Sequence, residues 1–361
     1  MKAIGARQYL PTSDPACLIK FEAEMPVPGA NDLLVRVEAV SVNPVDTKVR
    51  KLLGEGPHDP PRILGFDAAG VVVAMGSAVT GFSEGDEVFY SGDVTRAGCN
   101  AEFQAVDSRL VALKPESWSF AEAAAVPLVG LTAWELLFER MVATPFEHDP
   151  ENPPEIIDEP HGGNQMVWTN QFGPPLLIIN GAGGVGSAMI AIARLFRMTV
   201  VATASRPETR AWCESLGAHH VISHREPLRP QVEALGISEF PYIANLYDTE
   251  MYWETTADLL APLGTLGLIV ETKGPVDIGN PFRLKSPRIV WEYMPARSRF
   301  KTADMRRQGE ILADIAGMCE HGIFPKIATR VFDKISAVNL REAHAAMENG
   351  SAHGKWVLSG W

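Results

Sequence analysis

The sequence predicts an α/β protein of two domains, in which a doubly wound parallel sheet is inserted into a β-rich unit. Its 361 residues exceed the roughly 250–300 that one hydrophobic core accommodates. Strand and helix patterns alternate from Leu176 to Ser223, as in a parallel sheet covered on both faces. The turn between the first strand and the first helix of this stretch is rich in glycine, with Gly181, Gly183, Gly184 and Gly186.

The composition predicts a folded, acidic protein, with 46% hydrophobic and 21% charged residues. A net charge of −12 leaves no basic stripe for nucleic-acid phosphates or an anionic membrane, so neither partner is expected. The first residues, MKAIGARQYLPTSD, contain no long apolar stretch with a cleavage site, which predicts a cytoplasmic location. The cysteines form no C-x-x-C pair and are expected to be buried free thiols: Cys17, Cys99, Cys213 and Cys319.

The pattern of the N-terminal part predicts short strands, for example at 33–40 and 69–73, with turn-rich segments between them. From Ser119 onward the apolar residues adopt helical spacing, which marks the crossing to the next domain. We expect residues 1–129 and 292–361 to form the β-rich unit, and residues 130–291 to carry the parallel sheet.

An inserted surface loop is predicted near residues 141–175. This stretch is acidic and rich in proline, and its periodicity is too weak to predict a packed element.

After the insertion, the expected elements alternate between strand and helix. Strands are predicted at 176–180, 199–204, 220–223, 242–245, 267–270 and 289–291. Helices are predicted at 188–196, 209–216 and 304–320.

The glycine-rich turn fits the pattern G-x-G-x-x-G over the residues Gly181, Ala182, Gly183, Gly184, Val185 and Gly186. A strand before it, a helix after it and a second strand beyond are the context of a Rossmann dinucleotide site. Glycine lets the backbone approach a pyrophosphate closely, and the N–H groups of the helix N-terminus complement its charge. The alternative is a tight turn that binds no ligand.

The end of the second strand favours NADPH over NADH. An NAD-binding site usually has an acidic residue there, which accepts hydrogen bonds from the adenosine ribose. Here Ser205 and Arg206 follow the strand, and the first carboxylate is Glu208. The hydroxyl and the guanidinium can donate to a 2′-phosphate. The alternative for Arg206 is a surface arginine that precedes the helix starting at Pro207.

Several separated motifs resemble the quinone oxidoreductase and zeta-crystallin branch of the medium-chain dehydrogenase/reductase superfamily. They are the segments Ser41–Asp46, Gly65–Val71, Gly81–Val88, Gly130–Ala133 and the glycine-rich turn. The C-terminal half, including Lys285–Ser286, Asn339–His344 and Gly354–Leu358, is most similar to the subgroup called zinc-type alcohol dehydrogenase-like. The resemblance implies a GroES-like catalytic domain, built from both chain ends, around a central Rossmann domain. It also implies a homodimer.

Zinc dehydrogenases of this superfamily take ligands from a cysteine in the early loop and a histidine in a Gly-His-Glu motif. The equivalent positions here are Asn43 and Phe66, and neither side chain replaces a thiolate or an imidazole at zinc. We therefore expect no metal.

Without a metal to polarise a carbonyl, the easiest hydride acceptor is one that is already electrophilic, such as a quinone or the β-carbon of an α,β-unsaturated carbonyl. This agrees with the resemblance, which implies transfer of a hydride from NADPH to a quinone or an α,β-unsaturated carbonyl. Two alternatives remain: a non-catalytic NADPH-binding sensor or structural protein, and an alcohol dehydrogenase, whose base or metal the sequence does not show.

The resemblance also implies roles for individual residues near the nicotinamide. Asn43 would donate its amide to the substrate oxygen, or else cap its own turn before Pro44. Lys48 stands where related enzymes carry a tyrosine near the cofactor, or else is a solvated lysine. Thr132 would line the nicotinamide side, or else act as a helix N-cap.

Further candidates follow strand ends, where such sheets bind ligands. His224 matches a family position that packs against the adenine or its ribose, although a structural role is the alternative. The residues expected near the nicotinamide half are Leu246, Val270, Glu271, Thr272, Glu292 and Tyr293.

Overall fold

The structure is a computed structural model that describes residues 1–143, 155–158, 164–167 and 173–361. Contacts divide the chain into two compact units. Unit 1 contains Met1–Glu135, Ala182–Ala188 and Tyr293–Trp361, and unit 2 contains Leu136–Gly181 and Met189–Glu292.

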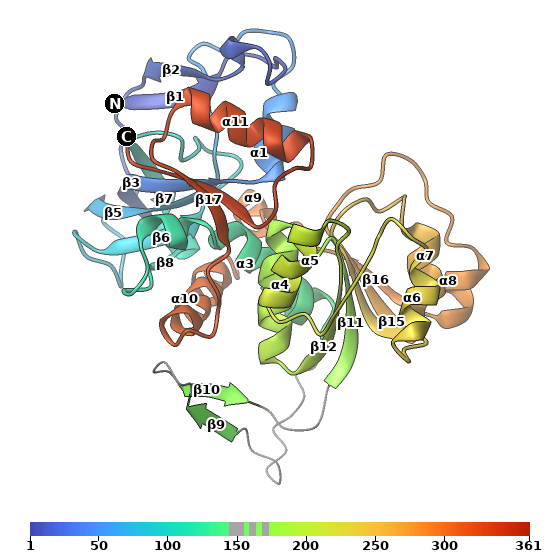
Figure 1. The fold of residues 1–361 in the computed structure, drawn as a ribbon. Helices are drawn as coiled ribbons and strands as arrows, with labels where there is room; N and C mark the ends of the chain where they lie inside the picture. Colours follow the sequence, from blue (N-terminus) through green and yellow to red (C-terminus); the bar gives the residue numbers. More distant parts are fainter. Residues whose placement is uncertain (144–154, 159–163, 168–172) are drawn as a thin grey trace. The chain divides into compact units, whose positions relative to one another are not determined.

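Unit 2 is built on a six-stranded sheet in which every neighbouring pair is parallel (Figure 1). In sheet order its strands are β13 (His220–Ile222), β12 (Met198–Thr203), β11 (Gly173–Ile179), β14 (Phe240–Asn245), β15 (Leu260–Leu268) and β16 (Arg288–Trp291). Counted along the chain from β11, this is the order 3-2-1-4-5-6 of a Rossmann sheet. The predicted doubly wound fold is confirmed.

Helices cover the sheet of unit 2 on both faces. They are α4 (Gly184–Leu195), α5 (Pro207–Ser215), α6 (Leu228–Ala234), α7 (Trp253–Leu259) and α8 (Gly279–Lys285). In Figure 1, α4 and α5 lie on one side of the sheet, and α6, α7 and α8 lie on the other. Because both faces are covered, the strands consist of nearly continuous runs of apolar residues. Four of these residues are buried in one core: Leu177, Val201, Ile243 and Leu266.

Several boundaries differ from the predicted ones for identifiable reasons. β11 begins at Gly173, before two prolines that argue against a strand, and its pairing with β12 shifts register between Gly173 and Pro175. Helix α5 begins at Pro207, because proline is well suited to the first helical position.

Unit 1 is rich in β-structure. In order its larger sheet contains β17 (Ala328–Phe332), β18 (Lys355–Ser359), β3 (Asp32–Val42), β5 (Asp67–Met75), β6 (Glu87–Ser91) and β8 (Val111–Leu113), and β7 (Phe103–Asp107) also pairs with β3. A smaller sheet contains β2 (Ile19–Glu22), β1 (Lys2–Ala6) and β4 (Arg62–Ile63). The C-terminal strand β18 pairs antiparallel with β3, so the two ends of the chain share one sheet.

The helices of unit 1 come from both halves of the chain. They are α1 (Pro44–Lys51), α2 (Phe120–Ala124), α3 (Pro127–Trp134), α9 (Ala296–Phe300), α10 (Arg307–Glu320) and α11 (Ala337–Glu348). One buried core joins apolar residues of β3, β5 and β6 to Leu340 and Ala343 of α11.

The insertion contains a feature that the sequence did not predict. Strands β9 (Glu155–Asp158) and β10 (Asn164–Val167) pair antiparallel, although the predicted loop contained no element. The rest of the segment 144–172 lies outside the described residues. No helix in the described part of the chain is both long and apolar enough to span a membrane.

Candidate functional site

The glycine-rich turn follows β11 at the point in the sheet where the strand order reverses. Asn180, at φ 70°, turns the chain in the left-handed region. Its N–H donates to Oγ1 of Thr203 at 2.9 Å, and the Gly181 N–H donates to the Thr203 carbonyl at 3.1 Å. A Cβ on Gly181 would lie 2.7 Å from that of Ala202, so this glycine is required by the close packing of the turn on β12.

The N-terminus of α4 is suited to an anion. The helix starts at Gly184 inside the glycine motif, and Ser187 donates both its N–H and its hydroxyl to the Gly183 carbonyl. The first amide groups of a helix have no intrahelical acceptor and carry the positive end of the helix dipole. The turn therefore fits the pyrophosphate of a dinucleotide.

The residues predicted to contact the 2′-phosphate and the adenine or its ribose lie at the ends of two adjacent strands. Ser205 and Arg206 follow β12, His224 follows β13, and these strands are paired up to Thr203 and Ile222. Burial lowers the pKa of His224, and the positive charges of Arg225 and Arg206 lower it further. Arg206 also occupies the N-cap position of α5, and its Nε lies 2.9 Å from the exposed carboxylate of Glu208.

The residues expected near the nicotinamide half all follow neighbouring strands of unit 2. Leu246 follows β14 and is buried, while Val270, Glu271 and Thr272 follow β15. Glu292 follows β16, where its buried carboxylate pairs with Arg140 at 2.8 Å. Tyr293 comes next in the chain, and its side chain is exposed.

Strand register in unit 1 brings Asn43 together with two residues that the sequence did not single out. In the pairing of β3 with its neighbours, Ser41 lies opposite Asp67 of β5, and Val42 lies opposite Trp356 of β18. Asn43 directly follows β3, and Lys355 is the first residue of β18. Asn43, Asp67 and Lys355 therefore meet at one end of three adjacent strands.

Asp67 is the centre of a buried hydrogen-bond network. Its Oδ2 accepts from Ser41 Oγ at 2.9 Å, from Asn43 Nδ2 at 2.8 Å and from Lys355 Nζ at 3.0 Å. Its Oδ1 accepts from the backbone N–H of Leu128 at 2.8 Å. Lys355 Nζ also donates to Asn43 Oδ1, so both ends of the Asn43 amide are engaged.

A second buried carboxyl adjoins this network. Burial raises the pKa of Asp46 to about 7, and the negative charge of Asp67 adds to the increase. The Asn43 N–H opposes it by donating to Asp46 Oδ2 at 2.6 Å. Burial therefore favours the protonated form of Asp46. The nearby thiol of Cys99 also has its pKa raised by burial, which keeps it neutral.

The other two catalytic candidates lie on the helices α1 and α3 of unit 1. Lys48 is on the exposed side of α1. Thr132 is inside α3, where its hydroxyl donates to the Leu128 carbonyl at 2.8 Å. The suggested role of Thr132 as an N-cap is wrong, because α3 starts five residues earlier at Pro127, with Val126 as its N-cap. Asn43 does occupy the N-cap of α1, where its backbone N–H donates to the side chain of Asp46, the third residue of the helix.

The residues at the expected metal position do not fit zinc. Asn43 has a neutral amide and Phe66 has no donor atom, whereas zinc sites use thiolate, imidazole or carboxylate ligands. The carboxylate of Asp67 is already bound to the Lys355 ammonium, and this buried cation would repel a second one. No cluster of three or more histidine, cysteine, aspartate or glutamate residues suited to a metal occurs within the described ranges.

This geometry predicts that the purified protein contains no stoichiometric zinc, because its donors cannot compete for the ion. Elemental analysis after dialysis measures the metal content. About one zinc per chain, together with activity that a chelator removes and added zinc restores, would contradict the prediction.

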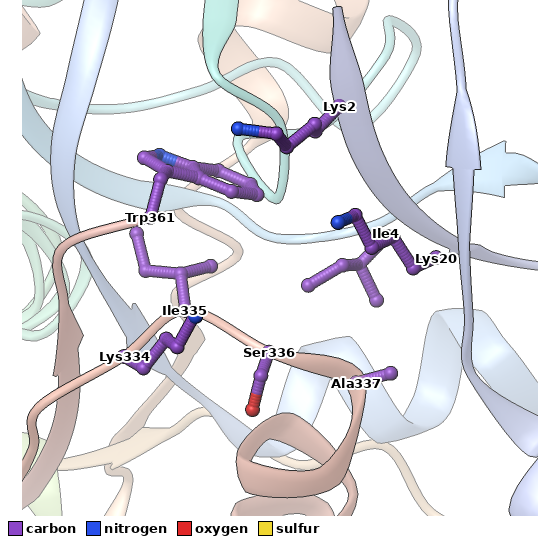
Figure 2. Close-up of a pocket in the computed structure, with 8 residues that line it drawn as sticks. All are labelled: Lys2, Ile4, Lys20, Lys334, Ile335, Ser336, Ala337 and Trp361. Atoms are coloured by element: carbon purple, nitrogen blue, oxygen red, sulfur yellow. The ribbon is translucent and has the colours of Figure 1, made fainter.

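A separate cavity of about 280 Å³ lies in unit 1, beside the N-terminus of α11. Figure 2 shows its lining, in which Lys2, Lys20 and Lys334 surround an apolar floor that includes Ile4 and Trp361. The lining residues include none of the candidate site residues, so we do not assign this cavity to the site.

Two family models match the chain. The alcohol dehydrogenase GroES-like domain matches residues 29–132, and the zinc-binding dehydrogenase family matches residues 184–307. The first match confirms that the predicted β-rich unit is GroES-like.

Some similar proteins match the chain over nearly its full length, and others match part of it. A zinc-type alcohol dehydrogenase-like protein of Staphylococcus aureus is 39% identical over 359 residues, which cover 99% of this chain and 100% of the relative. A crystal structure from Rhizobium etli, described as a zinc-dependent alcohol dehydrogenase protein, is 42% identical with a TM-score of 0.88 and covers 100% of this chain and 98% of that one. An NADPH-dependent alkenal/one oxidoreductase of Arabidopsis thaliana is 34% identical over 57% of this chain and 49% of its own.

Proposed function

Because the chain belongs to the medium-chain dehydrogenase/reductase superfamily, in its zinc-type alcohol dehydrogenase-like branch, we propose that it is a metal-independent reductase that uses NADPH to reduce quinones or α,β-unsaturated carbonyl compounds. The observation that carries this proposal is the buried Lys355 ammonium, which binds Asp67 and also Asn43, the residue that stands at a metal-ligand position by the resemblance to zinc dehydrogenases.

The proposed class of hydride acceptor rests on the side chains of Asn43, Asp67 and Lys355. A simple ketone or aldehyde needs strong polarisation of its oxygen before it accepts a hydride, and zinc is the usual means. A quinone or an enone is electrophilic through its conjugation and needs only orientation and a hydrogen-bond donor at its oxygen. The Arabidopsis relative, an alkenal/one oxidoreductase by name, supports this choice.

The residues that would hold NADPH fit its chemistry. The amides at the start of α4 would receive the pyrophosphate, the Ser205 hydroxyl and the Arg206 guanidinium would donate to the 2′-phosphate, and His224 would pack against the adenine or its ribose. When bound, the cofactor supplies the hydride from its nicotinamide ring. We further propose that residues 1–129 and 292–361 form the catalytic domain and residues 130–291 the dinucleotide-binding domain. We also propose that the protein is a cytoplasmic homodimer, and light scattering would test the dimer.

Turnover with a panel of substrates tests the function. We expect the purified protein to consume NADPH with a simple quinone or an alkenal, without added metal, and not to oxidise propan-2-ol. Oxidation of propan-2-ol with no quinone or alkenal activity would instead identify an alcohol dehydrogenase. Tight NADPH binding without turnover of any acceptor would favour a non-catalytic sensor or structural protein.

A further inference from the structure

Lys355 links the glycine-rich turn to Asn43 within unit 1. The N–H of the preceding residue, Gly354, donates to the Ala182 carbonyl of the turn at 2.8 Å. A Cβ on Gly184 would lie only 3.0 Å from Cδ of Lys355, so the aliphatic stem passes directly against the first residue of α4. The ammonium at its end binds Asn43 and Asp67, and the side chain is 2% exposed.

The charges around Asn43 allow only one orientation of its amide. In the observed orientation, Oδ1 faces the Lys355 ammonium and Nδ2 faces the Asp67 carboxylate. A flipped amide would place its N–H groups against a cation and its oxygen against an anion. Both contacts would then be repulsive in a buried site, where electrostatic interactions are strong.

The fixed amide retains one hydrogen for a ligand. Among the described residues, Nδ2 donates to Asp67 alone, although an amide nitrogen has two hydrogens. The cation on Oδ1 polarises the amide and strengthens its N–H groups as donors. A donor held in this way stabilises negative charge that develops on a substrate oxygen.

We propose that Lys355 is a positioning residue that fixes the orientation and donor strength of the Asn43 amide and supports the glycine-rich turn with its stem. The part that concerns Asn43 rests on the proposed reductase function. The part that concerns the turn does not, because it affects dinucleotide binding directly.

Three substitutions separate the ammonium from the stem. Lys355→Met removes the charge and keeps an unbranched stem, so kcat should fall on the order of 10²-fold while the NADPH dissociation constant stays near that of wild type. Lys355→Ala also removes the stem, and NADPH should then bind more weakly than it does to Lys355→Met. Lys355→Arg restores the cation and should recover most of the lost kcat.

Two controls distinguish positioning from a purely structural role. Lys114→Met removes another buried lysine of unit 1, whose ammonium binds the carbonyls of Pro115 and Trp118, and it should change stability without changing kcat. The double variant Lys355→Met/Asp67→Asn removes both charges of the buried pair, so it should regain the stability that the single variant loses. Its kcat should remain low, because the cation on Asn43 is still missing.

Nicotinamide fluorescence reports NADPH binding, thermal unfolding reports stability, and turnover of a quinone or an alkenal reports kcat. Wild-type kcat in Lys355→Met, or recovery of kcat together with stability in the double variant, would overturn the role at Asn43. Equal NADPH affinity of Lys355→Ala and Lys355→Met would overturn the role at the turn. If the wild type reduces no acceptor, the proposed reductase function is wrong. The NADPH affinities of Lys355→Ala and Lys355→Met then still test the role of Lys355 at the glycine-rich turn.

Discussion

Valine in place of Gly183 should abolish dinucleotide binding. Gly183 is the second glycine of the motif, where the backbone must approach the pyrophosphate without an intervening side chain. Its carbonyl also accepts from both the N–H and the hydroxyl of Ser187, so a distortion here spreads into the first turn of α4. We expect affinity for NADPH and NADH to fall below detection, and Gly186→Val to have the same effect through strand–helix packing.

Nicotinamide fluorescence titration measures this loss, and circular dichroism and thermal unfolding show whether the variant is folded. Gly317→Ala is a suitable control, because Gly317 lies in α10 and a Cβ there would meet no atom within 4 Å. This control should bind normally, with stability raised by up to about 1 kcal/mol. Tight NADPH binding by a well-folded Gly183→Val protein would show that the turn is not the phosphate site.

The Rossmann sheet could be predicted because each of its strands is a short apolar run, and residues typical of turns or helix starts follow it. The pattern located β11, β12 and β13 to within a few residues. It failed for β9 and β10, which lie in a proline-rich acidic segment with no periodic apolar face. It also placed only the end of β15, whose first half contains Pro262 and a residue of positive φ, Leu263.

The candidate site was predictable where it is local in sequence. The glycine-rich turn, Ser205 and Arg206 follow single strands, so a motif and its position identify them. The network around Asp67 joins residues that are 24 and 288 positions away, and only the register of β18, β3 and β5 brings them together. Asp67 and Lys355 do lie in two of the motifs found in the sequence. A motif alone, however, does not show that its charged residue forms a buried ion pair with the charged residue of another motif.

The network around Asp67 also bears on the resemblance to zinc enzymes, because it includes Asn43, which stands at an expected metal-ligand position. At Asn43, where the resemblance to zinc dehydrogenases implies a metal ligand, this chain has an amide bound to an internal ion pair of Lys355 and Asp67. Breaking a buried ion pair by removing one partner costs about 3–5 kcal/mol. A single substitution that introduces a zinc ligand at Asn43 would therefore not create a metal site, because Lys355 and Asp67 would remain.

Wild type should prefer NADPH to NADH, and Arg206→Ala should remove most of that preference. The residues that directly follow β12 are Ala204, Ser205 and Arg206, without a carboxylate, and the guanidinium of Arg206 lies near His224 at the ends of two paired strands. Hydrogen bonds to charged groups contribute about 1.5–3 kcal/mol, so the variant should lose that amount with NADPH and almost nothing with NADH. The existing pair with Glu208 is partly exposed and contributes only about 0–1 kcal/mol, so a 2′-phosphate can replace it at little cost.

Dissociation constants of both cofactors for wild type and variant, measured at fixed ionic strength, test this preference directly. Arg229→Ala is the matched control, because it removes the same charge from unit 2 while Arg229 is bound to Asp258. It should change NADPH affinity only through weak, screened long-range attraction. If Arg206→Ala weakens both cofactors equally, its effect comes from the start of α5, where Arg206 is the N-cap, and not from a phosphate contact. A wild type that prefers NADH would likewise exclude Arg206 from the 2′-phosphate site.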